Sequence, residues 1–310
     1  MTLSLLLQLT VCSLIACGAI YTVVNKLSVL GLKNQQIPRF WISIIMGFVM
    51  ALPNVVIAVL SIHKIISPAP PPSIIFMFLI INLFFFIPLL TMLRPFNYSL
   101  SAARLEIPFL FAICVIYFFY GLEGETFTLK KIIPMGIIFI MFCYDIMRML
   151  ELGDYKIEST AKESKTKSLL TVFAMSVIFA LSVLPFAIYS DIFSTQKVHT
   201  FYEILLLSSA VILGILPNIC IIVTWLKNNA PPELLVCSII FSYVFTCSFL
   251  IPLVAFYIPV LCTTALIFCS VISLVGLAVL WLQVTYLTYS NRIVAVIMLA
   301  IFLILTYSNF

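Results

Sequence analysis

Long apolar runs alternate with short polar segments along this chain, and the length of the runs predicts helices that cross a membrane. A membrane-spanning helix needs about 20 predominantly apolar residues. On that measure the pattern predicts ten spans in two sets of five, which cover about 3–24, 40–62, 73–93, 107–122 and 132–149, and then about 169–190, 203–226, 234–256, 259–282 and 293–309. The expected fold class is an all-α polytopic membrane protein.

A strongly polar stretch, ELGDYKIESTAKESKTKS at 151–168, divides the chain into regions 1–150 and 169–310. Its mixed charge and lack of apolar residues predict a solvated linker. Twelve Lys and Arg residues fall in loops on the linker's side of the predicted spans and four fall on the opposite side. The positive-inside rule therefore predicts a cytosolic linker, with both termini extracellular or lumenal.

A short motif, Leu-Pro-Asn, occurs at 52–54 and again at 216–218, each time in the middle of an apolar run. Proline removes one helix N–H and frees a carbonyl, and in lipid that carbonyl needs a partner. Pro88 follows Asn54 by 34 residues within an Ile-Pro-Leu segment, and Pro252 follows Asn218 in the same way. A plain kink is the alternative for either copy alone. The pairing favours a transporter built from two inverted five-helix repeats.

The composition agrees with a membrane protein and excludes several other classes. Of 310 residues 64% are hydrophobic and 9% are charged, against about 25% charged in soluble domains, and the mean hydropathy is +1.26. The net charge of +5 is scattered over loops, so no nucleic-acid partner is expected. The nine cysteines have no metal-binding or disulfide spacing. With no nucleophile–base constellation or phosphate loop, neither an enzyme nor a cofactor is expected.

The order of these features resembles the cation/calcium exchanger superfamily, in which ten helices form five plus five and the hairpin of helices 2 and 3 recurs as helices 7 and 8. Several short motifs are similar to the mitochondrial-type sodium/calcium exchangers. They are LRPF (93–96), GLEGET (121–126) and WLK (225–227), the last followed by Pro231-Pro232 and a helix with Ser238, Ser242 and Thr246. The resemblance implies an exchanger fold and cation antiport.

The chain departs from that superfamily at its central motif, Gly-Asn-x-x-x-acid. Pro53-Asn54 and Pro217-Asn218 take the Gly-Asn places, so the acidic places fall on Ala58 and Ile222. Calcium takes about 6–8 oxygen ligands, normally including carboxylates, and burying it without anionic partners is costly. With no carboxylate in these places, the neutral oxygens that remain at the predicted midplane favour a monovalent cation such as sodium, with calcium as the alternative.

The candidate ion or substrate ligands are neutral residues at the predicted midplane: Asn54, Asn218, Thr224 and Thr246. Their alternative role is hydrogen bonding between membrane helices, which is also the expected role of Asn82 and Ser242. We expect an altered cation antiporter in a lipid bilayer. Two other functions stay open: a transport-inactive exchanger relative that acts as a subunit or regulator, and a carrier of a neutral solute.

The acidic residues support the view that the site is altered. Ten of the eleven, Glu106 among them, are expected in loops or at span ends. Asp145 lies within the span 132–149, three residues before Arg148. At that spacing two helical side chains are neighbours, so an ion pair is the expected role of Asp145. Its alternative role is that of a functional carboxylate within the membrane.

Overall fold

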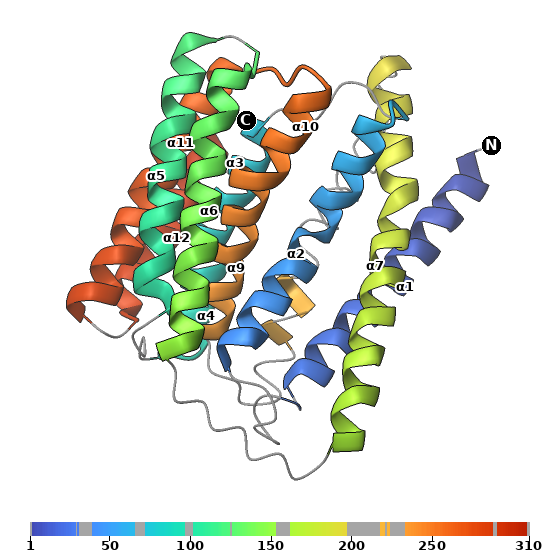
Figure 1. Ribbon diagram of the computed structural model, residues 1–310, viewed down its shortest axis with the longest axis horizontal. Helices are drawn as coiled ribbons and strands as arrows, with labels where there is room; N and C mark the ends of the chain where they lie inside the picture. The colour runs from blue at the N-terminus through green and yellow to red at the C-terminus, as the bar shows by residue number, and fades with distance from the viewer. Residues whose placement is uncertain are drawn as a thin grey trace. The chain divides into compact units, whose positions relative to one another are not determined.

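The fold is known from a computed structural model that describes residues 2–28, 30, 39–65, 72–96, 102–124, 126–152, 162–196, 218–220, 222–223, 233–287 and 290–308 (Figure 1). Its regular elements in this described part are helices, which satisfy their own backbone groups as a bilayer requires. They are α1 (Thr2–Ser28), α2 (Arg39–Ile62), α3 (Pro72–Ile81), η2 (Asn82–Phe86), α4 (Ile87–Leu93), α5 (Ala102–Glu123), α6 (Leu129–Leu152), α7 (Lys162–Gln196), α9 (Glu233–Phe245), η3 (Thr246–Leu250), α10 (Ile251–Tyr257), α11 (Thr264–Leu282), η4 (Gln283–Leu287) and α12 (Arg292–Ser308).

Seven helical segments of the described part are long and apolar enough to cross a membrane, and the chain is an integral multi-pass membrane protein. They coincide with seven of the ten predicted spans: Leu7–Leu27, Trp41–Ile62, Pro72–Leu93, Glu106–Glu123, Thr166–Ile188, Leu235–Tyr257 and Thr264–Leu287. Helices α6 and α12 cover the predicted spans 132–149 and 293–309. Most of the predicted span 203–226 lies outside the described residues.

Two boundaries differ from the sequence prediction. The helix expected from Pro259 begins at Thr264, because the chain before it is extended and pairs with another loop. The predicted linker 151–168 is partly helical, since α6 runs to Leu152 and α7 begins at Lys162. Lysine and glutamate are good helix formers, and adding residues to an existing helix is much easier than nucleating one.

The described chain divides into two compact units, and each draws on both halves of the sequence. Unit 1 contains residues 1–69 and 155–230, and unit 2 contains residues 70–154 and 231–310. The predicted regions 1–150 and 169–310 are defined by an internal repeat rather than by packing, and they remain a prediction.

In unit 1, α1 packs along α7, and α2 also packs against α7 (Figure 1). The face of α1 that is buried repeats every three to four residues: Ala16, Ala19, Ile20, Val23, Val24 and Leu27. Leu60 of α2 and Ala187 of α7 form a small buried cluster. Small residues at such contacts let membrane helices approach closely, which is the main source of their association in lipid.

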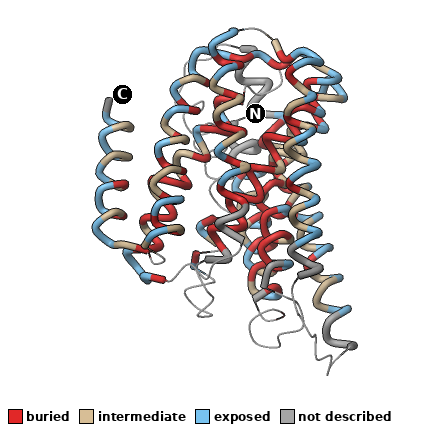
Figure 2. Tube along the Cα trace, turned by 60° about the vertical axis from the view of Figure 1, so that its left-hand side comes forward, coloured by how far each residue is buried: buried red, intermediate tan, exposed pale blue. Residues whose placement is uncertain are grey.

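In unit 2, the two halves of the chain exchange partners. The hairpin arm α3–η2–α4 packs against α11 and α12, and the arm α9–η3–α10 packs against α5 and α6. Helix α12, which ends at the C label in Figure 2, buries Ala295 and Met298 but is otherwise mostly exposed or half-buried. The Phe302 ring on the same helix lies 5.4 Å from the Phe85 ring. The first arm therefore packs against helices from the second half of the chain, and the second arm packs against helices from the first half.

The two arms are broken at matching places. Each has a five-residue π-helix, η2 or η3, followed by a seven-residue α-helix that begins Ile-Pro-Leu. Ile87 N–H bonds to the Asn82 carbonyl, and Ile251 N–H bonds to the Thr246 carbonyl. The sequence offset that relates Asn54 to Asn218 also relates these two breaks. Single-turn π segments of this kind are often found at functional sites.

After each break an extended segment pairs with a residue two positions before a helix, α12 for the first arm and α6 for the second. Beyond α4, the Phe96 carbonyl accepts a bond from Ser290 N–H at 2.8 Å. Beyond α10, the Val260 carbonyl accepts a bond from Phe127 N–H at 3.0 Å. Phe96 and Val260 are related by the same offset as the breaks. The correspondence between the two arms thus continues past the helices.

Candidate functional site

The broken helices of unit 2 carry backbone carbonyls without a donor in their own helix, and a membrane interior has no water to supply one. Pro88 has no N–H, so it bonds neither the Phe84 carbonyl, its α-helical partner, nor the Leu83 carbonyl, its π-helical partner. Pro252 has the same effect on the carbonyls of Ser248 and Cys247. Four of the five residues in each π segment are buried, the exceptions being Phe85 and Phe249. Each arm therefore presents backbone oxygens that need another donor or a cation.

Asn82 opens the first break and joins it to the second arm. Its Nδ2 donates to the Phe78 carbonyl at 2.9 Å and to the Tyr243 hydroxyl at 2.8 Å. Because a carbonyl can only accept, the first bond fixes which end of the amide is the donor. The Tyr243 hydroxyl must then accept from Asn82, and its own proton points elsewhere. This buried bond links helix α9 to the π segment η2 within unit 2.

Tyr117 of α5 meets the second break. Its hydroxyl donates to the Cys247 carbonyl at 2.9 Å, and the residue is fully buried. Sequence analysis identified neither Tyr117 nor Tyr243. A signal existed, because Cys247 lies five residues before Pro252 and its carbonyl needs a donor. Which helix supplies that donor is decided by tertiary packing.

The predicted site residues fall in both compact units. Thr246 is fully buried at the first position of η3 in unit 2. Asn54 is half-buried on α2, and Asn218 is 2% exposed in a short helical segment, both in unit 1. Thr224 lies outside the described residues. Their roles as ligands remain a prediction.

The two positions that would carry acids are apolar and buried. Ala58 is 5% exposed and Ile222 is 6% exposed. Across the described residues, no three His, Cys, Asp or Glu side chains come together as they would around a metal ion. Because calcium normally requires several carboxylates, this part of the chain offers no cluster of the kind it prefers.

Of the two carboxylates discussed from the sequence, Glu106 lies where it was expected and Asp145 lacks its expected partner. Glu106 stands at the end of a candidate span, as predicted, and it is buried within α5 at 3% exposure. Within the described residues, Asp145 and Arg148 of α6 do not form the expected ion pair. The ion pair found there joins Lys131 and Glu123. Spacing on a helix makes a pair feasible, but rotamer choice decides whether it forms.

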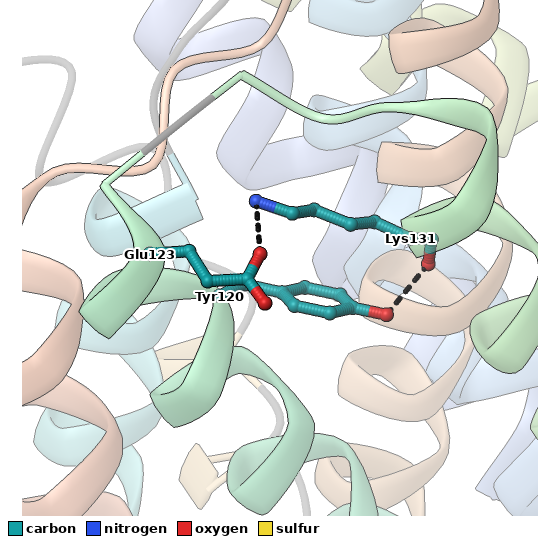
Figure 3. Close-up of polar contacts among 3 residues, drawn as sticks. All are labelled: Tyr120, Glu123 and Lys131. Atoms are coloured by element: carbon teal, nitrogen blue, oxygen red, sulfur yellow. Dashed lines mark hydrogen bonds and ion pairs between the residues drawn. The ribbon is translucent and has the colours of Figure 1, made fainter.

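That ion pair lies at the loop between α5 and α6 (Figure 3). Lys131 Nζ is 2.7 Å from Glu123 Oε2 and 5.4 Å from the centre of the Tyr120 ring, and the Tyr120 hydroxyl donates to the Lys131 carbonyl at 2.8 Å. Gly124 has a φ of 65°, a conformation that glycine adopts at no steric cost. Burial raises the pKa of the Cys262 thiol, and the Lys131 charge partly offsets this. These contacts brace a loop, and they do not form a ligand site.

Comparison with known proteins identifies the fold through solved structures and not through sequence. No protein-family profile and no curated protein matches the sequence. Solved structures of the sodium-calcium exchanger NCX_Mj do match. The structure soaked with 2.5 mM Na+ and 1 mM Sr2+ has a TM-score of 0.69 at 14% identity, with 99% of each chain covered. The structure soaked with 100 mM Na+ and 10 mM Sr2+ has a TM-score of 0.69 at 15% identity, again with 99% of each chain covered. The chain therefore has the fold of this sodium-calcium exchanger, as the sequence resemblance predicted.

Proposed function

We propose that this chain is a membrane transporter of the cation-exchanger type with an altered ion site, and that it carries a monovalent cation such as sodium. The exchanger fold supports the class of function. The observation that carries the choice of ion is the pair of buried apolar residues, Ala58 and Ile222, at the two acidic places of the motif. Amide, hydroxyl and carbonyl oxygens can replace part of the water shell of a monovalent ion. They cannot neutralise a divalent one.

The proposed architecture is ten helices in two inverted repeats, with the linker in the cytosol. Three matched features support the repeat: the π-helical breaks, the Ile-Pro-Leu starts that follow them, and the extended segments ending at Phe96 and Val260. The exchange of packing partners between the arms supports it too. Labelling of intact cells should reach tags at both termini and miss tags in 153–161. Termini on opposite sides would rule the architecture out.

The transport proposal is tested by flux into liposomes that contain the purified protein. We expect sodium uptake down an imposed gradient and weak or undetectable calcium uptake. Replacing Asn54 and Asn218 together by leucine should lower sodium flux at least tenfold, because these amides are matched between the repeats. Thr22→Val is the control, since this hydroxyl bonds only its own helix, at the Gly18 carbonyl. Robust sodium-driven calcium flux by the unmodified chain would contradict the proposal.

A gain-of-function variant tests the ion preference from the other direction. The double substitution Ala58→Asp and Ile222→Asp restores a carboxylate at each acidic place. We expect calcium to raise the melting temperature of this variant and to leave that of the parent unchanged, because a ligand that binds only the folded state stabilises it. A variant that folds but shows no calcium-dependent shift would mean that the motif has been aligned wrongly.

A second candidate function is a transport-inactive exchanger relative that serves as a subunit or regulator. The specific observation in its favour is that the Cys247 carbonyl at the second break is already bonded by Tyr117. Liposomes would then show no flux of sodium, potassium or calcium, although the protein is folded. That result would select this function over transport.

A further inference from the structure

The two broken helices of unit 2 have the same backbone pattern, but they differ in the side chain that donates to their freed carbonyls. In each arm a proline removes the donor that the preceding π segment needs, at Pro88 or Pro252. A buried carbonyl without a donor costs free energy comparable to a lost hydrogen bond. Such an oxygen is also a dipole that can coordinate a cation at membrane depth. The fate of these carbonyls therefore bears on ion binding.

At the second break one of the two freed carbonyls, that of Cys247, is occupied. Cys247 is the π-helical partner of Pro252, and its carbonyl accepts the Tyr117 hydroxyl at 2.9 Å. The proton of that hydroxyl points at the carbonyl oxygen. The oxygen keeps a second lone pair, but the positive end of the hydroxyl dipole lowers its negative potential and weakens it as a cation ligand.

Tyr117 is held in this position by its surroundings. Its ring lies 5.1 Å from the Phe76 ring and 5.6 Å from the Phe127 ring, measured between centroids. The side chain is fully buried. Phe76 belongs to the first arm and Phe127 to the loop that pairs with Val260. A side chain packed this closely cannot swing away without loosening several elements.

The first break has no equivalent hydroxyl. Among the described residues, no side chain donates a hydrogen bond to the Leu83 carbonyl, the π-helical partner of Pro88. A glycine of α11 approaches instead. A Cβ added at Gly276 would lie 2.7 Å from Phe84 Cε2 and 3.2 Å from Leu83 Cβ. Helix α11 therefore packs directly against this break.

We propose that Tyr117 is a specificity-determining residue, which keeps the Cys247 carbonyl at the second break from serving as a cation ligand. The freed carbonyls that keep their full strength toward an ion in unit 2 are then those of the first break and the Ser248 carbonyl of the second. This inference rests on the proposed cation transport and names a determinant of it. Removal of the hydroxyl proton restores the Cys247 carbonyl as a ligand and strengthens cation binding.

The test compares Tyr117→Phe with Tyr120→Phe. Both variants lose a buried phenol that donates to a backbone carbonyl, but the Tyr120 acceptor is Lys131, away from either break. Melting temperatures are measured in detergent in sodium chloride and in choline chloride at equal ionic strength. We expect Tyr117→Phe to reach half of its sodium-dependent shift at a sodium concentration at least threefold lower than the parent, and Tyr120→Phe to match the parent.

Equal sodium dependence in Tyr117→Phe and the parent would overturn the inference. If Tyr117→Phe does not fold, 4-fluorophenylalanine at position 117 keeps the volume near the carbonyl without the proton, and the same comparison applies. This outcome is separate from that of the flux assay. A parent that carries sodium, with a Tyr117→Phe variant of unchanged sodium affinity, removes only the role of Tyr117. A parent that carries no cation removes the transport proposal instead.

Discussion

The two broken helices of unit 2 are alike in backbone and unlike in chemistry. Both have a π segment, an Ile-Pro-Leu start and an extended exit. The first break begins with an amide, Asn82, which donates to Tyr243 of the other arm. The second begins with a hydroxyl, Thr246, and its next carbonyl is bonded by Tyr117. The backbone has kept the repeat, while the side chains have diverged.

This difference shows which part of an ion path is fixed by the fold and which part is open to change. Proline frees a carbonyl whatever side chain stands nearby, so the break persists as long as the proline does. The donor that meets the carbonyl is set by one residue on a neighbouring helix. A single substitution on α5 can therefore alter the chemistry of a break without altering its backbone. The following predictions test how far the two arms differ.

The largest expected effect is at the glycine contact of the first arm. Gly276→Leu forces a side chain into Leu83 and Phe84, where even a Cβ lies too close. Overpacking a buried contact costs about 1–3 kcal/mol, and more when the neighbours cannot move. We expect little folded protein by size-exclusion chromatography. Gly136→Leu is the control, since nothing lies within 4 Å of a Cβ there. Equal yields of the two variants would mean that α11 does not pack closely on the first break.

The next effect concerns the amide that links the arms. Asn82→Leu removes two buried bonds and leaves the Tyr243 hydroxyl without its donor. The expected loss in unfolding free energy is about 1–3 kcal/mol. Adding Tyr243→Phe should recover part of it, because removing both partners of a buried bond costs less than removing one.

Thr91→Val is a matched control for the amide prediction, because this buried hydroxyl bonds only the Ile87 carbonyl of its own helix. Its unfolding free energy should fall by less than about 1 kcal/mol. If the double variant Asn82→Leu with Tyr243→Phe were less stable than Asn82→Leu alone, the bond between the arms would not be the cause of the loss.

A smaller effect is expected at the exit of the second arm, where Cys262 lies near the ion pair of Figure 3. Burial raises the pKa of this thiol, Lys131 lowers it and Glu123 raises it. Because the thiolate is the reactive form, Lys131→Gln should slow maleimide labelling a few-fold at pH 8, and Glu123→Gln should speed it. Site-resolved mass spectrometry measures both rates. Changes in the same direction would show that access rather than charge controls this thiol.

Much of the fold could be predicted from the sequence because a bilayer leaves few choices. Apolar runs of about 20 residues must be helices, and seven predicted spans coincide with candidate membrane helices. The matched prolines predicted that the arms correspond. The start at Thr264 was missed because Pro259 reads as a helix start, whereas the chain there pairs with the loop at Phe127.

The site was less predictable, for a physical reason. Sequence spacing identifies residues that can be polar at the midplane, such as Thr246, but a hydrogen bond also needs a partner from elsewhere in the fold. Tyr243 and Tyr117 supply those partners from distant parts of the chain. Both read as ordinary aromatic residues in apolar runs. The burial of Glu106 could not be predicted from its place at a span end, because packing decides whether such a residue is solvated.

The central claim, that Tyr117 satisfies a carbonyl freed by Pro252, is tested most directly by a double-mutant cycle on unfolding free energy. Tyr117→Phe alone should cost about 1–3 kcal/mol, because it leaves a buried carbonyl without a donor. In a Pro252→Ala background the new N–H can bond within the helix, so the same change should cost at least about 1 kcal/mol less. In a Pro88→Ala background, Tyr117→Phe should lower the unfolding free energy by the same amount as in the parent. Equal costs in all three backgrounds would contradict the account.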